Sequence, residues 1–209
     1  MLEIHLFVNP LGQGCRRSEI DVAKCDQMSA VKVRVTIVPL LNMATIQQTI
    51  GLYHLPANDL DLRSRVCQTL YQAILDYKAA QFQGQKRARK FLMQQQQTLD
   101  DNHLYYDDDL AVKIAKSVPI DIEMFKEDRH GEMVKKAFRD DQQLASQMGI
   151  TETETAVVID TSNPNCGVKI DNFSFERLLK AYEKVHCARC ALQNLANHRV
   201  PINRFLKRE

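Results

Sequence analysis

Residues 3–14 read Glu3-Ile4-His5-Leu6-Phe7-Val8-Asn9-Pro10-Leu11-Gly12-Gln13-Gly14, and this stretch decides the fold. Its first half alternates and then becomes continuously apolar, which is typical of a buried strand, and its second half consists of turn residues. Apolar residues at helical spacing follow between Cys15 and Met28, and the stretch from Val31 to Leu41 is rich in Val and alternates again. The first 41 residues are therefore predicted to form a βαβ unit.

The middle of the chain is predicted to be helical. Leu62, Val66 and Leu70 lie at four-residue steps, which favours a helix from about Asp59 that ends before Gly84, with Asn58 or Asp59 as its cap. Further helices are expected over residues 85–99, after the acidic stretch 100–109, and over residues 122–148 with a division at Gly131. No convincing strand pattern occurs between these helices.

Strand patterns return after residue 150. Residues 155–159 are an apolar run, and residues 168–170 follow a turn rich in Asn and Pro, so the two runs are predicted to form a hairpin. A last helix is expected from the cap residue Ser174 to about Ala196, with Leu178 and Leu179 on its buried side. The predicted order is thus βαβ, a block of helices, and ββα.

Composition and charge exclude several classes of protein. The chain has 209 residues with only 7 Gly and 6 Pro, and 44% are hydrophobic, which is typical of a compact helix-rich protein. Its 28 basic and 26 acidic residues leave a net charge of +2, so neither nucleic acid nor a membrane is an expected partner. The first residues lack the pattern of a signal peptide, and we expect a cytoplasmic protein with reduced cysteines.

The predicted order of elements is that of a thioredoxin fold with an inserted helical block, and the sequence resembles the DsbA-like proteins. In that family the first strand leads through Phe-Val-Asp-Pro into a Cys-x-x-Cys motif, and residues 7–15 align with this segment. Residues 149–155 match the family's Gly-Val-x-Gly-Thr-Pro-Thr loop in length and position. The resemblance implies an α/β thioredoxin-like domain of residues 1–41 and 149–209, with residues 42–148 as an inserted helical subdomain.

The positions that carry the family's chemistry are changed. Gly12 stands in place of the nucleophilic cysteine, and only the second cysteine is kept, as Cys15. Cys25 is about 15 Å along the predicted helix from Cys15, too far for a disulfide. Glu154 stands in place of the family's cis-proline, so the peptide bond before it is expected to be trans. We therefore expect a non-catalytic protein. The candidate partner-binding residues are Pro10, Leu11, Gly12, Gln13, Gly14, Cys15, Thr153, Glu154 and Thr155.

Among DsbA-like proteins, the sequence is most similar to the cytoplasmic YjbH-type adaptors of Gram-positive bacteria. Residues 7–11 suggest this similarity, and residues 121–130 with 136–141 suggest it more strongly. The resemblance implies a protein-binding adaptor that presents a regulator of the Spx type to the ClpXP protease. We expect this chain to use no cofactor. The alternative is an enzyme that uses Cys15, either a thiol-disulfide oxidoreductase or a glutathione transferase similar to the kappa class.

Three further features have simple interpretations. Cys187 and Cys190 form a Cys-x-x-Cys pair in the last predicted helix, and we expect helix-face cysteines rather than a metal site or a redox pair. The basic cluster from Lys86 to Lys90 is most simply a solvated helix face, although a charge-matched protein partner could use it. The basic tail from Arg199 is expected to be a frayed terminus or a docking segment.

Overall fold

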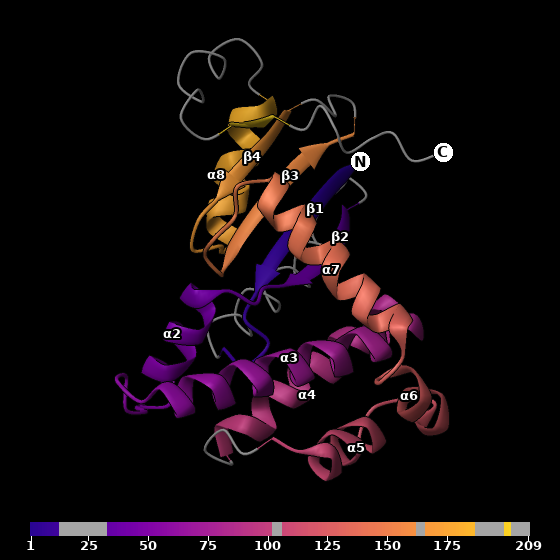
Figure 1. The fold of residues 1–209 in the computed structure, drawn as a ribbon. Helices are drawn as coiled ribbons and strands as arrows, with labels where there is room; N and C mark the ends of the chain where they lie inside the picture. Colours follow the sequence, from indigo (N-terminus) through magenta and orange to yellow (C-terminus); the bar gives the residue numbers. More distant parts are fainter. Residues whose placement is uncertain (13–32, 102–105, 162–165, 187–198, 202–209) are drawn as a thin grey trace. The chain divides into compact units, whose positions relative to one another are not determined.

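The computed structural model describes residues 1–12, 33–101, 106–161, 166–186 and 199–201, and Figure 1 shows its elements. By their contacts, the described residues divide into two compact units, one of residues 1–8, 33–38, 145–161, 166–186 and 199–201 and the other of residues 9–12, 39–101 and 106–144. These limits differ from the expected 42–148 for the insertion, because residues just after the first strand contact the helical unit. That the two units are separate domains stays a prediction.

The first unit is built on a five-stranded sheet with the order β2-β1-β3-β4-β5. Its strands are β1 (Leu2–Val8), β2 (Val33–Pro39), β3 (Thr155–Asp160), β4 (Cys166–Ile170) and β5 (Arg199–Pro201). The β1–β3, β3–β4 and β4–β5 pairs are antiparallel. The predicted hairpin of β3 and β4 is confirmed, with Val158 opposite Val168. The expectation of a frayed terminus is wrong for Arg199–Pro201, because these residues extend the sheet by pairing with β4.

Helix α8 (Phe175–His186) lies against β4 in the same unit. Its predicted cap is confirmed, because the Ser174 hydroxyl accepts a hydrogen bond from the backbone N–H of Arg177 at 3.3 Å. Leu178 is buried as expected, whereas Leu179 is 45% exposed, so the expectation for Leu179 is wrong. Successive residues of a helix point about 100° apart, and only one of the two faces the sheet. Cys187 and Cys190 lie outside the described residues.

The second unit is helical. Its elements are α2 (Met43–Leu52), α3 (Leu60–Phe82), α4 (Gln85–Asp101), α5 (Asp108–Lys116), α6 (Ile122–Asp128) and α7 (Glu132–Gln147), the last three residues of α7 belonging to the first unit. Asp59, Asp107 and Asp121 cap α3, α5 and α6 by accepting hydrogen bonds from backbone N–H groups at 2.9, 2.8 and 3.0 Å. The predicted helices, including the division near Gly131, are therefore confirmed.

Helix α2 was not predicted. It begins with a capping box, in which the Asn42 side chain accepts from the backbone N–H of Thr45 at 2.9 Å and the Thr45 hydroxyl accepts from the N–H of Asn42 at 2.9 Å. Its buried side chains include Ile46 and Ile50, which join a core cluster with Leu11 of the turn after β1. This short helix thus packs beside the loop that aligns with the family's redox motif.

Helix α3 is the central helix of the helical unit. All residues from Ala73 to Ala80 are buried, including the charged residues Asp76 and Lys78.

In α6 and α7, Phe125 and Val134 are fully buried, whereas the neighbouring residues Met124 and Met133 are 45% and 67% exposed. Among the described residues, no helix has both the length and the apolar character that crossing a membrane requires.

Candidate functional site

The turn after β1 lies where the family has its redox motif. The backbone N–H of Gly12 donates to the carbonyl of Asn9 at 2.9 Å, and the Asn9 side-chain oxygen accepts from the N–H of Leu11 at 3.0 Å. The Asn9 side chain is fully buried, and its Nδ2 donates to Gln48 Oε1 at 2.9 Å and to Thr49 Oγ1 at 3.0 Å. Asn9 therefore shapes the turn and fastens it to α2.

Two further hydrogen bonds hold the backbone of this turn. The hydroxyl of Tyr53 donates to the Leu11 carbonyl at 3.2 Å, and Gln95 Nε2 of α4 makes a longer contact of 3.5 Å with the Pro10 carbonyl. A Cβ atom built on Gly12 would lie 3.2 Å from Asn9 Cβ, closer than an ordinary van der Waals contact. The position aligned with the nucleophile thus has no side chain and little room for one. Gln13, Gly14 and Cys15 lie outside the described residues.

The second candidate loop lies directly before β3. Glu154 has a φ of +63°, in the left-handed region, and its N–H donates to the Phe7 carbonyl at 3.0 Å. Its carbonyl accepts from the N–H of Phe173, and the Thr155 hydroxyl donates to Asp171 at 3.3 Å. The peptide bond before Glu154 is trans, as expected. Proline requires φ near −65°, so this loop has a backbone that differs from the one a proline would need.

The joint role of these two loops stays a prediction. Pro10, Leu11 and Gly12 belong to the helical unit, whereas Thr153, Glu154 and Thr155 belong to the unit with the sheet. Each loop is well defined by its own hydrogen bonds.

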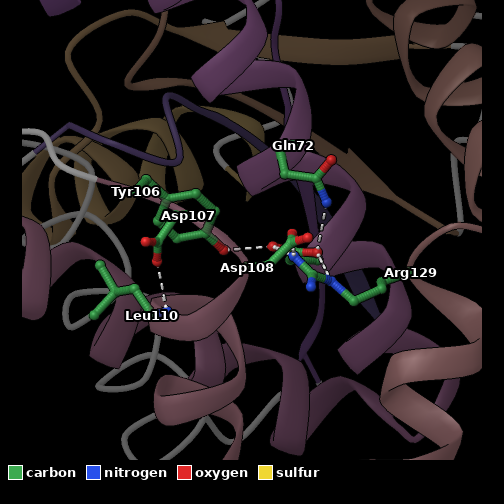
Figure 2. Close-up of polar contacts among 7 residues, drawn as sticks. Gln72, Tyr106, Asp107, Asp108, Leu110 and Arg129 are labelled. Carbon is green, nitrogen blue, oxygen red and sulfur yellow. Dashed lines mark hydrogen bonds and ion pairs between the residues drawn. The ribbon is translucent and has the colours of Figure 1, made fainter.

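A buried network of charges, shown in Figure 2, lies in the helical unit. The Arg129 guanidinium contacts the Asp76 carboxylate through two hydrogen bonds, from Nε at 2.7 Å and from Nη2 at 2.9 Å. The Tyr106 hydroxyl and the Gln72 amide also donate to Asp76, at 2.6 and 3.1 Å. Asp76 is 0% and Arg129 3% exposed, and Arg129 Nη2 reaches the exposed Asp108 at 3.0 Å. The network joins α3, α5 and the end of α6.

Burial and charge act in opposite directions on these groups. Burial raises the pKa of Asp76, and the hydrogen bonds and charge of Arg129 oppose that rise. Burial lowers the pKa of Arg129, but the hydrogen bonds and charge of Asp76 outweigh it, so the net change is upward. Burial and the Asp76 charge raise the pKa of Tyr106 well above its usual value, so its hydroxyl keeps its proton and donates. These properties suit a structural anchor inside the unit.

A second buried ion pair connects α3 to α7. Lys78 Nζ contacts the Asp141 carboxylate and donates to Gln81 Oε1 at 2.9 Å, and the Lys78 side chain is 3% exposed. Burial raises the pKa of Asp141 to about 6, against the charge of Lys78. Arg129 and Asp141 both lie in the segment with the stronger resemblance to the adaptors. That segment is therefore anchored to α3 at two points.

Sequence reasoning did not identify either ion pair. The only signal was the presence of Asp76 and Lys78 in the otherwise apolar stretch from Ala73 to Ala80. Charged residues are rarely fully buried unless they are paired, so this stretch calls for partners. In the described ranges, no three His, Cys, Asp or Glu side chains are arranged to hold a metal ion.

Comparisons with known proteins find adaptors among the relatives. Over 124 residues, 57% of this chain and 41% of the relative, the chain is 36% identical to the ClpXP adapter protein SpxH of Bacillus cereus. It is 29% identical to SpxH of Bacillus subtilis over 117 residues, 55% of this chain and 38% of that protein. With SpxH of Staphylococcus saprophyticus it is 23% identical over 172 residues, 81% of this chain and 60% of that protein. The chain thus spans less than half the length of the first two relatives.

Solved structures show the same fold. DsbA of Xylella fastidiosa matches with a TM-score of 0.60 and 14% identity over 87% of this chain and 82% of that one. The cytosolic disulfide reductase DsbM of Pseudomonas aeruginosa matches with a TM-score of 0.57 and 14% identity over 89% of this chain and all of that one. The family model described as thioredoxin matches residues 5–181. The chain therefore belongs to the thioredoxin family, with the DsbA-like form of its fold.

Proposed function

We propose that this chain is a protein-binding adaptor that presents a regulator of the Spx type to the ClpXP protease. The observation that carries the proposal is its similarity to several proteins named ClpXP adapter protein SpxH, at 36% identity to the relative from Bacillus cereus. Because the match spans 41% of that relative, the adaptor role of this chain needs a direct test.

The turn after β1 supports a role without thiol chemistry. A thiol-disulfide oxidoreductase needs a nucleophilic thiolate at the start of the first helix, and Gly12 supplies none. The hydrogen bonds of Asn9 hold this turn in one conformation, as suits a surface that binds a protein. We therefore propose that Pro10 to Cys15 and Thr153 to Thr155 contact the client.

The test is degradation of a purified Spx-type regulator by purified ClpXP, with and without this chain. We expect this chain to increase the degradation rate, and the Cys15→Ser variant to increase it equally. No binding of the regulator and no increase in rate would contradict the proposal. Insulin reduction and glutathione conjugation, measured on the same protein, test the enzymatic alternative, in which Cys15→Ser would abolish activity.

A pair of variants tests the proposed contact residues. Glu154→Ala removes a carboxylate from the candidate loop, whereas Glu176→Ala removes one from the exposed first turn of α8. We expect Glu154→Ala to weaken binding of the regulator and Glu176→Ala to leave it unchanged. Equal affinities for both variants would show that this loop does not contact the client.

A further inference from the structure

The first part of α4 carries an unusual concentration of positive charge. Lys86, Arg87, Arg89 and Lys90 occupy four of five successive positions, and residues 77–99 contain no Asp or Glu. Lys86, Arg87 and Lys90 are exposed, and Arg89 is half-buried. None of the four makes an ion pair with a residue that the structure describes. These four residues are called the basic end of α4.

Helix stability does not explain this placement. The N-terminus of a helix has a partial positive charge, which favours acidic residues there and disfavours basic ones. Helices α3, α5, α6, α7 and α8 follow this rule, since each has an acidic residue in its first turn. The first turn of α2 has no charged residue, whereas that of α4 lacks an acidic residue and contains Lys86 and Arg87. Lys86 and Lys90 also lie one turn apart, where like charges repel. The basic end of α4 therefore carries a cost that an anionic partner would relieve.

An exposed aromatic side chain lies close to these charges along the chain. Phe82, the last residue of α3, is 41% exposed and is separated from Lys86 by a tight turn at Gly84. Gln81 Nε2 donates to Gln85 Oε1 at 3.2 Å, which holds the end of α3 to the start of α4. An apolar contact and several cations are thus available at one helix junction.

We propose that the basic end of α4, with Phe82, binds an acidic segment of a protein partner. Carboxylates of the segment pair with Lys86, Arg87 and Lys90, and an apolar side chain of the segment contacts Phe82. Several carboxylates bound together gain more than a single surface ion pair, and their field speeds the encounter. This inference rests on the proposed adaptor function, since an adaptor holds a client and a protease, and it gives the chemistry of one of these contacts.

The experiment measures binding of a fluorescein-labelled peptide of about a dozen residues composed of Glu, Leu and Ala, by fluorescence anisotropy at low salt. We expect Lys86→Gln/Lys90→Gln to weaken binding about tenfold and added salt to weaken binding to the unmodified chain. The matched control is Lys113→Gln/Lys116→Gln, which removes the same charge from exposed positions of α5 and should leave binding unchanged. A melting temperature at or above that of the unmodified chain would show that Lys86→Gln/Lys90→Gln is folded.

Three results would overturn the inference: equal affinities for the two double variants, equal binding of a peptide with Gln in place of Glu, or tighter binding of a short DNA duplex of equal charge. The degradation assay separates this inference from the proposed function. If the unmodified chain speeds degradation but does not bind the Glu peptide, only the inference fails. If it binds the peptide through Lys86 and Lys90 but does not speed degradation, only the adaptor function fails.

Discussion

Replacing Arg129 by Met should destabilise the helical unit strongly. The substitution keeps most of the side-chain volume but removes the guanidinium that donates two hydrogen bonds to Asp76, at 2.7 and 2.9 Å. The Asp76 carboxylate is 0% exposed, so water cannot replace the lost partner. Breaking a buried ion pair on one side typically costs about 3 to 5 kcal/mol, because an unpaired charge remains or must be neutralised.

The expected loss of stability is large because the pair is buried, and an exposed ion pair within α6, the helix that ends just before Arg129, serves as the comparison. Lys126 and Glu123 of α6 also form an ion pair, at 2.9 Å, but their side chains are 46% and 80% exposed. An exposed pair contributes about 0 to 1 kcal/mol, so Lys126→Met should change the free energy of unfolding by less than about 1 kcal/mol. The two substitutions remove one positive charge each, three residues apart.

Urea unfolding followed by circular dichroism at pH 7 measures both effects. The double variant Asp76→Met/Arg129→Met should lose clearly less unfolding free energy than the sum of the losses of its two single variants, because neither charge is then left without its partner. A loss for Arg129→Met no larger than for Lys126→Met would refute the assignment of a buried, coupled pair. Strict additivity in the double variant would refute it as well.

The remaining predictions concern Glu154, Asp141 and Gly12. Glu154→Pro should lower the free energy of unfolding by about 3 kcal/mol or more, because the φ of this residue is +63° and its N–H, which donates to Phe7, is lost. Glu154→Gly should leave the free energy of unfolding unchanged or raise it by up to about 1 kcal/mol, because glycine adopts a positive φ readily. Thermal unfolding of both variants checks this. Burial raises the pKa of Asp141 to about 6. Between about pH 4 and pH 6 the folded protein therefore holds a proton on Asp141 that the unfolded chain releases. The free energy of unfolding should decrease by up to about 3 kcal/mol as the pH rises over this range. Urea titrations at several pH values should show this decrease in the unmodified chain and a smaller one in Asp140→Asn, because the charge of Asp140 helps to raise the pKa of Asp141. Asp141→Asn should remove the contribution of Asp141; the same slope in Asp141→Asn as in the unmodified chain would contradict the assignment. Gly12→Cys should lower the free energy of unfolding in denaturant by about 1 to 3 kcal/mol, because the added Cβ would lie 3.2 Å from Asn9 Cβ. Gly51→Ala should not lower it, because a Cβ at Gly51 would have no atom within 4 Å.

Elements with long, regular patterns were predictable from the sequence. The repeat of Leu62, Val66 and Leu70 located α3, and Asn58 or Asp59 was expected as its cap, of which the structure has Asp59; the apolar period and the cap are both local signals. The weak elements were not predictable. α2 has a short apolar face, and its capping box at Asn42 is a signal that only its geometry made clear. β5 has three residues, one of them proline, and forms through pairing with β4.

The candidate site was predictable only in part. Local spacing located the turn at Gly12, and the structure shows how Asn9 fixes it through Gln48 and Thr49, which are about 40 positions away in the chain. The partnership of Asp76 with Arg129 spans 53 positions, and no local pattern encodes which distant cation meets a buried carboxylate. Such pairings depend on how helices pack, and helix packing is decided by the tertiary structure.

The two buried charges of α3 also limit how this helix can be placed. Asp76 and Lys78 are two residues apart, so they point about 200° apart around the helix, one to Arg129 at the end of α6 and the other to Asp141 of α7. An apolar helix that rotated or slid by a residue could make new apolar contacts in place of the old ones, but here either movement would also break two buried ion pairs. The charges therefore select one rotation and one register for α3. A shortened helical unit without α7 would leave the charge of Lys78 without its carboxylate partner, so any such redesign would have to replace Lys78 as well.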